Sequence, residues 1–283
     1  MSEIIRDYLT LGTSCEKNIG SHNLSERARF QGILYENLKD EFGRDVLKEV
    51  SRNTVVLGGA ILALEHLTGA TAAFKPGTLN QILGINDGVE DMSGKNPTIA
   101  LFGLGTGGAA LDFGSINAKD IKTRDIPSMV PLRVCEELTG SEADQYYMKQ
   151  LNSDGTTYSW YLKEFADAIT IKSLWKDAAE EDVDGTEIVS EVYNSDRTEG
   201  IESFAELKIE LNVKDVREYF ESIGELDMAR YNTLGIYTGN KVTLPDGTID
   251  YVNVRLFAYT NFNNRDLSLQ TEASYTYRIF ALV

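Results

Sequence analysis

The sequence predicts an α+β protein, in which a helical N-terminal region is followed by a mostly antiparallel, β-rich region that ends in a C-terminal strand. Between Ser25 and Val50, apolar residues recur every four positions, which indicates an amphipathic helix. Over Phe204–Val213 the apolar residues instead alternate with polar ones, which indicates a strand. The same period of two runs through Tyr275–Val283, so we expect the last strand to include the final residues.

The composition is that of a globular protein with an acidic surface. The 283 residues are 42% hydrophobic and 25% charged, enough for one large or two medium domains. The net charge of −17 disfavours nonspecific binding to nucleic acid. The longest apolar run, Val55–Leu64, is well short of the roughly 20 residues that span a bilayer. We therefore expect neither a nucleic-acid nor a membrane partner, and synthesis in a cytoplasm.

The expected organisation is a helical region over residues 1–95 and a β-rich domain over residues 96–283. Acidic residues are concentrated from Lys176 to Arg230, a segment that contains 17 acidic and 6 basic residues. From Tyr231 onward the two signs balance, at 4 each. The segment around 176–230 is thus predicted to be a solvated acidic insertion in the β-rich domain.

Two helices are expected in the N-terminal region. The first covers Ser25–Val50, with Ser25 as its N-cap and Gly43 as a point where it can break. The second covers Thr54–Thr68 and is apolar nearly all the way round, so we expect it to be buried on most sides. The cover is either the core of this chain or a neighbouring subunit.

A glycine-rich segment, Thr98–Gly114, contains the spacing G-x-G-x-x-G at Gly103, Gly105 and Gly108. A dinucleotide site needs such glycines to open a helix whose N-terminus holds the pyrophosphate. Here Gly114 and Asn117 interrupt any helix within two turns. The segment is therefore interpreted as structural, and no cofactor is expected.

Shorter elements follow in the middle of the chain. Pro131 confines Ser128–Val134 to an edge strand, because proline cannot donate to a sheet ladder. The other expected elements are a helical turn at Thr78–Leu83, strands at Thr157–Phe165 and Ala168–Leu174, an acidic loop at Lys176–Thr186 and a short helix at Lys214–Ile223.

The C-terminal part is predicted to be an antiparallel sheet. Pro245-Asp246-Gly247 forms a hairpin turn, in which proline presets φ and glycine accepts a positive φ. The last strand carries apolar groups on both faces, so it needs a cover from this chain or a neighbour. The residues expected to make that interface are Tyr275, Tyr277, Ile279, Phe280, Leu282 and Val283.

Motifs for catalysis or metal binding do not stand out. The two histidines, His22 and His66, and the two cysteines, Cys15 and Cys135, do not lie at the spacing of a zinc site. The acids of the sequence DVDGTE, from Asp182 to Glu187, favour a solvated loop over a surface cation site. We expect no catalytic residue, no metal site and no enzymatic activity.

Two stretches, YNTLGIYTG at 231–239 and VRLFAYTNF at 254–262, belong to a C-terminal segment that resembles the closing part of tailed-bacteriophage virion structural proteins. Those proteins are of the neck or collar, head-vertex or baseplate type. The resemblance implies a non-enzymatic component of a phage particle, assembled in the host cytoplasm with copies of itself or other virion proteins. The alternatives are a β-type receptor- or glycan-binding module with exposed Trp160 and Tyr161, and an enzyme that uses the glycine-rich segment.

Overall fold

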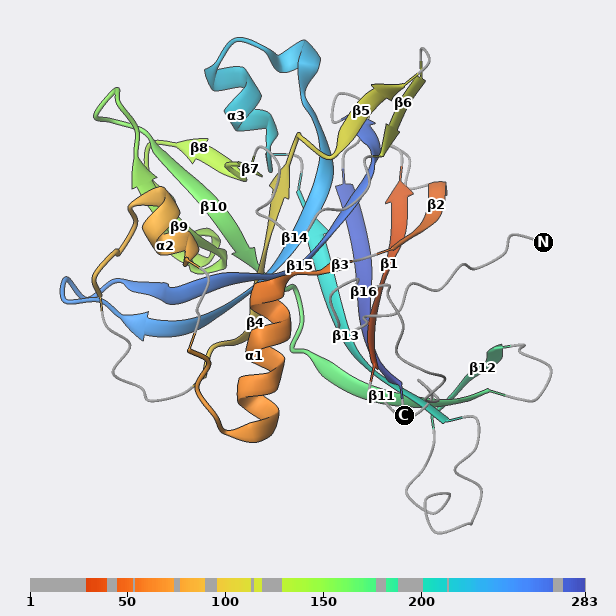
Figure 1. Ribbon diagram of the computed structural model, residues 1–283. Coiled ribbons are helices and arrows are strands. Elements are labelled where there is room, and N and C mark those ends of the chain that lie inside the picture. The colour runs from red at the N-terminus through yellow and green to blue at the C-terminus, as the bar shows by residue number, and fades with distance from the viewer. Residues whose placement is uncertain are drawn as a thin grey trace.

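The structure is a computed structural model that describes residues 29–39, 45–52, 54–73, 77–89, 96–112, 115–118, 129–176, 182–187, 201–212, 214–266 and 272–282. Within these ranges the fold is mostly antiparallel β-sheet with few helices (Figure 1). The helices are α1 (Leu57–Thr68), α2 (Leu79–Leu83) and α3 (Arg217–Ser222), with 3-10 turns at Gly140–Gln145 and Leu226–Met228.

Six of the described strands form one sheet, called here the six-stranded sheet. In spatial order they are β12 (Asp182–Glu187), β11 (Thr170–Lys176), β13 (Ile201–Leu211), β16 (Glu272–Leu282), β1 (Arg29–Lys39) and β2 (Asp45–Arg52). All neighbours are antiparallel.

The other large sheet contains eight of the described strands and is called here the eight-stranded sheet. Its order is β3 (Thr54–Val55), β15 (Ile249–Asp266), β14 (Arg230–Thr243), β4 (Thr98–Gly105), β10 (Tyr158–Glu164) and β8 (Arg133–Cys135), with β7 (Met129–Val130) beside β4 and β9 (Tyr146–Leu151) beside β10. A separate hairpin joins β5 (Ala109–Asp112) and β6 (Ser115–Ala118).

The predicted helix over Ser25–Val50 is wrong, because its described parts are the strands β1 and β2. The apolar spacing of four is close to one helical turn, but it is also two periods of a strand. Leu34 shows the consequence: it lies in the middle of β1, directly opposite Tyr277 of β16, and is fully buried. Residues before Arg29, including the expected N-cap Ser25, lie outside the described residues.

The expected division at residue 95 does not separate two sheets. β1 pairs along its whole length with β16, so the first described strand lies beside the last (Figure 1). β3 likewise pairs with β15. The segment around 176–230 is not simply a solvated insertion either, because β13 lies between β11 and β16 and buries Leu207 and Ile209 completely.

Two clusters of buried side chains make up the core. The larger cluster lies between the two large sheets and includes Leu207 and Tyr277 of the six-stranded sheet with Phe102 and Ile236 of the eight-stranded sheet. The second cluster lies on the other face of the eight-stranded sheet, where Leu79 of α2 packs with Leu101 of β4 and Met148 of β9. The central strand β4 is therefore buried on both faces, as its run of apolar residues requires.

Several elements agree with the sequence. The turn at Pro245–Gly247 joins β14 to β15, with Gly247 at φ 87° and its amide donating to the Leu244 carbonyl at 2.9 Å. The expected strands around 157–165, 168–174 and 204–213 are present, as are helices within 54–68, 78–83 and 214–223. The helix expected from Thr54 begins only at Leu57, because Thr54–Val55 form β3. The strand expected at 128–134 is divided into β7 and β8, which pair with different strands. The expected acidic loop at 176–186 is wrong in its last part, since β12 begins at Asp182 and pairs with β11.

Candidate functional site

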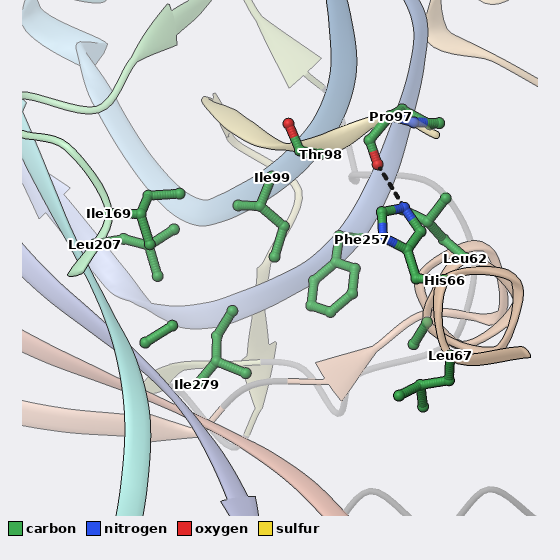
Figure 2. Close-up of a pocket in the computed structure, with 12 residues that line it drawn as sticks. Leu62, His66, Leu67, Pro97, Thr98, Ile99, Ile169, Leu207, Phe257 and Ile279 are labelled. Atoms are coloured by element: carbon green, nitrogen blue, oxygen red, sulfur yellow. Dashed lines mark hydrogen bonds between the residues drawn. The ribbon is translucent and has the colours of Figure 1, made fainter. Parts of the chain in front are cut away.

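An open apolar pocket of about 390 Å³ lies beside α1, where the two sheets meet that helix (Figure 2). Its walls come from α1, the start of β4, β13, β15 and β16. The lining includes Leu62, His66, Ile99, Leu207, Phe257 and Ile279. Since these strands are far apart in the sequence, the pocket depends on the tertiary fold.

The sequence explains why α1 packs so closely at this place. Gly59 faces β15, and a Cβ atom built there would lie 2.2 Å from the Phe257 carbonyl oxygen. That carbonyl also accepts a hydrogen bond of 3.0 Å from the Val56 amide, just before the helix. Glycine therefore allows the backbone of α1 to contact β15 directly. The next turn of the helix then presents Leu62 and His66 to the pocket.

The helix is not buried on most sides, contrary to the expectation from its composition. Leu62 is 4% exposed, but Leu64 is 46% and Leu67 is 69% exposed. The fold covers only the side of α1 that faces β15 and the pocket. An apolar side of a helix that none of the described residues covers is typical of an interaction surface.

A strip of apolar side chains continues from the pocket across the six-stranded sheet. Ala205 lies directly opposite Ile171 on one neighbouring strand and Ile279 on the other. Directly opposite residues share a face of an antiparallel sheet, so Ile171 extends the wall that Ala205 and Ile279 form. Ile171 is 82% exposed, and Ile169 at the pocket rim is also exposed. We call the pocket lining, which includes Leu67 and Ile169, together with Leu64 and Ile171, the apolar face.

The expected interface residues of β16 divide into three groups. Tyr275 and Tyr277 are each 1% exposed, buried between the sheets, so they are not on any surface that this chain offers. Ile279 lines the pocket. Phe280 and Leu282 are placed only as members of β16, and Val283 lies outside the described residues.

The outer face of β16 is polar at Arg278. Arg278 donates to Glu206 at 2.9 Å, and Lys172 donates to the other oxygen of the same carboxylate at 2.7 Å. The Arg278 guanidinium also lies over the ring of Phe204, 4.7 Å from its centroid. Burial opposes ionisation of Glu206, but the two hydrogen bonds outweigh it and lower the pKa of that carboxyl. These ion pairs hold β11, β13 and β16 together.

A second cluster of titratable groups is buried near α3. Asp215 accepts hydrogen bonds from the Tyr146 hydroxyl at 2.6 Å, from Lys163 at 3.0 Å and from the Asn212 amide at 2.9 Å. Burial, with the nearby Asp215 carboxylate, raises the pKa of Tyr146, so its hydroxyl stays protonated and donates. The next residue, Val216, has φ 69°, which is strained for a β-branched side chain. The cluster therefore fixes a strained turn.

Arg133 ties the same region to α3. It is 2% exposed and makes two hydrogen bonds to Glu218, at 2.8 and 2.9 Å, and one to Glu142. The charge of Arg133 is thus balanced by the carboxylates of Glu218 and Glu142, and these ion pairs have a structural role.

The glycine-rich segment also has a structural role. β4 ends at Gly105 and is followed by β5, not by a helix. At Gly108 an added Cβ would lie 2.2 Å from the Thr233 hydroxyl, and the Gly108 amide donates to Asn232 at 2.5 Å. Glycine is required there because the chain passes directly against β14.

The tryptophan expected to contact a glycan is not exposed, since Trp160 is only 4% exposed within the core. A polar pocket of about 480 Å³ lies elsewhere, lined by Gln81, Asn86, Asp87 and Asn253. Within the described ranges, no three His, Cys, Asp or Glu side chains are placed to hold a metal ion. No helix in these ranges is long and apolar enough to cross a membrane.

Comparisons of this chain with protein-family models, with curated protein sequences and with solved structures found no match.

Proposed function

We propose that this chain is a non-enzymatic structural component of a tailed-phage particle, built into the virion in the host cytoplasm. It assembles through the apolar face, either with copies of itself or with neighbouring virion proteins. The phage assignment is supported by the resemblance of the C-terminal segment, which contributes β14, β15 and β16 to the two sheets.

The single observation that carries the assembly role is the exposure of Ile171 next to an open apolar pocket. Leaving apolar surface in water costs roughly 25 cal/mol per Å², so a continuous strip of it favours a partner that removes it from solvent. Two different elements, α1 and β11, contribute exposed side chains to the strip. Ile279, one of the interface residues expected from the sequence, lies between them in the pocket wall.

The test compares two exposed isoleucines. Ile171→Lys places a charge on the apolar face, whereas Ile249→Lys changes a residue that is 57% exposed next to the β14–β15 turn. We expect the first variant to lower the oligomeric mass in light scattering, or incorporation into particles purified on a density gradient, and the second to match the wild type. If both variants match the wild type, the apolar face is not the assembly surface. If purified particles lack the chain, the virion assignment is wrong.

A second candidate, a receptor- or glycan-binding module, is favoured by the polar pocket beside α2. Amide side chains there can bond to sugar hydroxyls, and the pocket is held rigidly by buried Asn80, which donates to the Ile85 and Tyr251 carbonyls. Titration with a panel of simple saccharides, followed by NMR, tests this function. Saturable binding that is lost in Asn253→Gly supports it.

A further inference from the structure

The pocket beside α1 is uncharged and has few polar groups. None of its lining residues is Asp, Glu, Lys or Arg, and the walls are made by aliphatic side chains and Phe257. Its volume of about 390 Å³ is within the range of roughly 300–1,000 Å³ that is usual for ligand sites. A charged group would lose its hydration here without gaining a partner of opposite sign, so the occupant is uncharged and mostly apolar.

The pocket lining includes one histidine, His66. His66 Nε2 lies 3.1 Å from the Pro97 carbonyl oxygen. A carbonyl only accepts, so in this hydrogen bond Nε2 carries the proton, and Nδ1 of the neutral ring is then an acceptor. Figure 2 shows Nδ1 on the side of the ring that faces Phe257, and it shows the Thr98 hydroxyl pointing away from the pocket.

We infer that the pocket receives an apolar group that carries one hydrogen-bond donor, and that a tyrosine or tryptophan side chain of the assembly partner supplies it. Such a side chain combines a large apolar area with a donor at its tip. The donor bonds to His66 Nδ1 while the ring packs between Phe257 and Ile279. This inference rests on the proposed function, because it names what the partner places in the apolar face.

The experiment uses two small probes that differ only in the donor. 4-Methylphenol represents the tyrosine side chain, and toluene is the same ring without the hydroxyl. Titration of each into the full chain, followed by NMR chemical shifts, gives both dissociation constants. We expect 4-methylphenol to bind about threefold or more tightly than toluene, as one hydrogen bond of modest net strength gives.

Two variants assign that difference to the pocket. In His66→Phe the ring stays but the acceptor is lost, so the two probes should bind equally well. In Ala63→Phe a new side chain fills the pocket from α1, so both probes should lose affinity. Ala63→Phe also reports any binding elsewhere on the surface, which it leaves unchanged.

The inference is overturned if neither probe binds saturably, or if both bind the wild type equally. Its failure is distinct from failure of the proposed function, which depends on the assembly defect of Ile171→Lys. If Ile171→Lys impairs assembly and the probes do not bind, the apolar face is an interface without this aromatic anchor. If the probes bind as expected and Ile171→Lys assembles normally, the pocket is a ligand site and the assembly role is wrong.

Discussion

The hydroxyls of Tyr231 on β14 and Tyr275 on β16 form a hydrogen bond in the core, and so join the two sheets. Tyr231 is 0% and Tyr275 1% exposed. Phe262 on β15 packs against both rings, with centroids 5.8 Å from Tyr231 and 6.3 Å from Tyr275. The contact places a polar pair inside an aromatic cluster, where each hydroxyl needs a hydrogen-bond partner.

This pair should show strong coupling. Tyr275→Phe removes one hydroxyl and its hydrogen bond to Tyr231, which we expect to lower the free energy of unfolding by about 1–3 kcal/mol. The double variant Tyr231→Phe/Tyr275→Phe should lose less free energy of unfolding than the two single variants lose together. The reason is that the hydrogen bond between the two hydroxyls can be lost only once. Urea denaturation of the four proteins measures the coupling. Additive losses would show that the two hydroxyls do not stabilise each other.

A charge should strongly destabilise the fold at one leucine of α1 and have little effect at another. Leu62→Asp puts a carboxylate into an apolar site and should destabilise the fold by several kcal/mol, or about the whole stability of a marginal domain. Leu67→Asp, at the rim of the pocket where the side chain is 69% exposed, should change stability by about 0.5 kcal/mol or less. Thermal unfolding followed by circular dichroism separates them. Equal effects would contradict the one-sided burial of α1.

The glycine-rich segment should be sensitive to a single methyl group. Gly108→Ala forces a Cβ against Thr233 and should cost about 1–3 kcal/mol by overpacking. Gly77→Ala is the matched control, because the nearest atom to its Cβ is a flexible Gln81 oxygen at 3.5 Å. We expect neither NAD nor ATP to raise the melting temperature of the wild type. If NAD or ATP raises the melting temperature of the wild type but not of Gly108→Ala, the segment is a nucleotide site.

Deletion of Tyr275–Val283 should prevent correct folding, although the residues are terminal. β16 lies between β13 and β1, so the deletion removes two antiparallel ladders together with buried Tyr275 and Tyr277. The truncated chain should aggregate or elute in the void volume during gel filtration. A soluble product with the wild-type circular dichroism spectrum would show that the six-stranded sheet forms without its central strand.

Stability should depend on pH through Glu206. Its pKa in the folded chain is lower than the ordinary value of 4.5, so the carboxylate stabilises the fold above that pH. The stabilisation is lost as the pH falls through the folded pKa and the group becomes protonated. Glu206→Gln should therefore be less stable than the wild type at neutral pH, and the difference should shrink in acid. A difference that is independent of pH would mean that the ion pairs with Lys172 and Arg278 contribute nothing.

Local sequence patterns predicted an element correctly where they fit only one backbone conformation. Pro245 and Gly247 restrict the backbone to a tight turn, and Gly247 has the positive φ that this turn needs. The alternation across Phe204–Val213 fits a strand and not a helix, and β13 covers Ile201–Leu211. The run after Thr54 is apolar without the alternation that a half-buried strand shows, and α1 forms there over Leu57–Thr68.

By itself, the sequence determined the antiparallel, β-rich character of the chain, the hairpin turn and α1, because periodicity and turn chemistry act over a few residues. Only the tertiary structure decided that the segment from Arg29 is a strand. An apolar spacing of four residues fits both a helix and a strand, and the partner strand β16 is more than 230 residues away. The pocket required the same long-range pairing, which brings Leu62, Phe257 and Ile279 together. Pairing of distant strands depends on which apolar faces bury one another, and a local pattern carries no record of its partner.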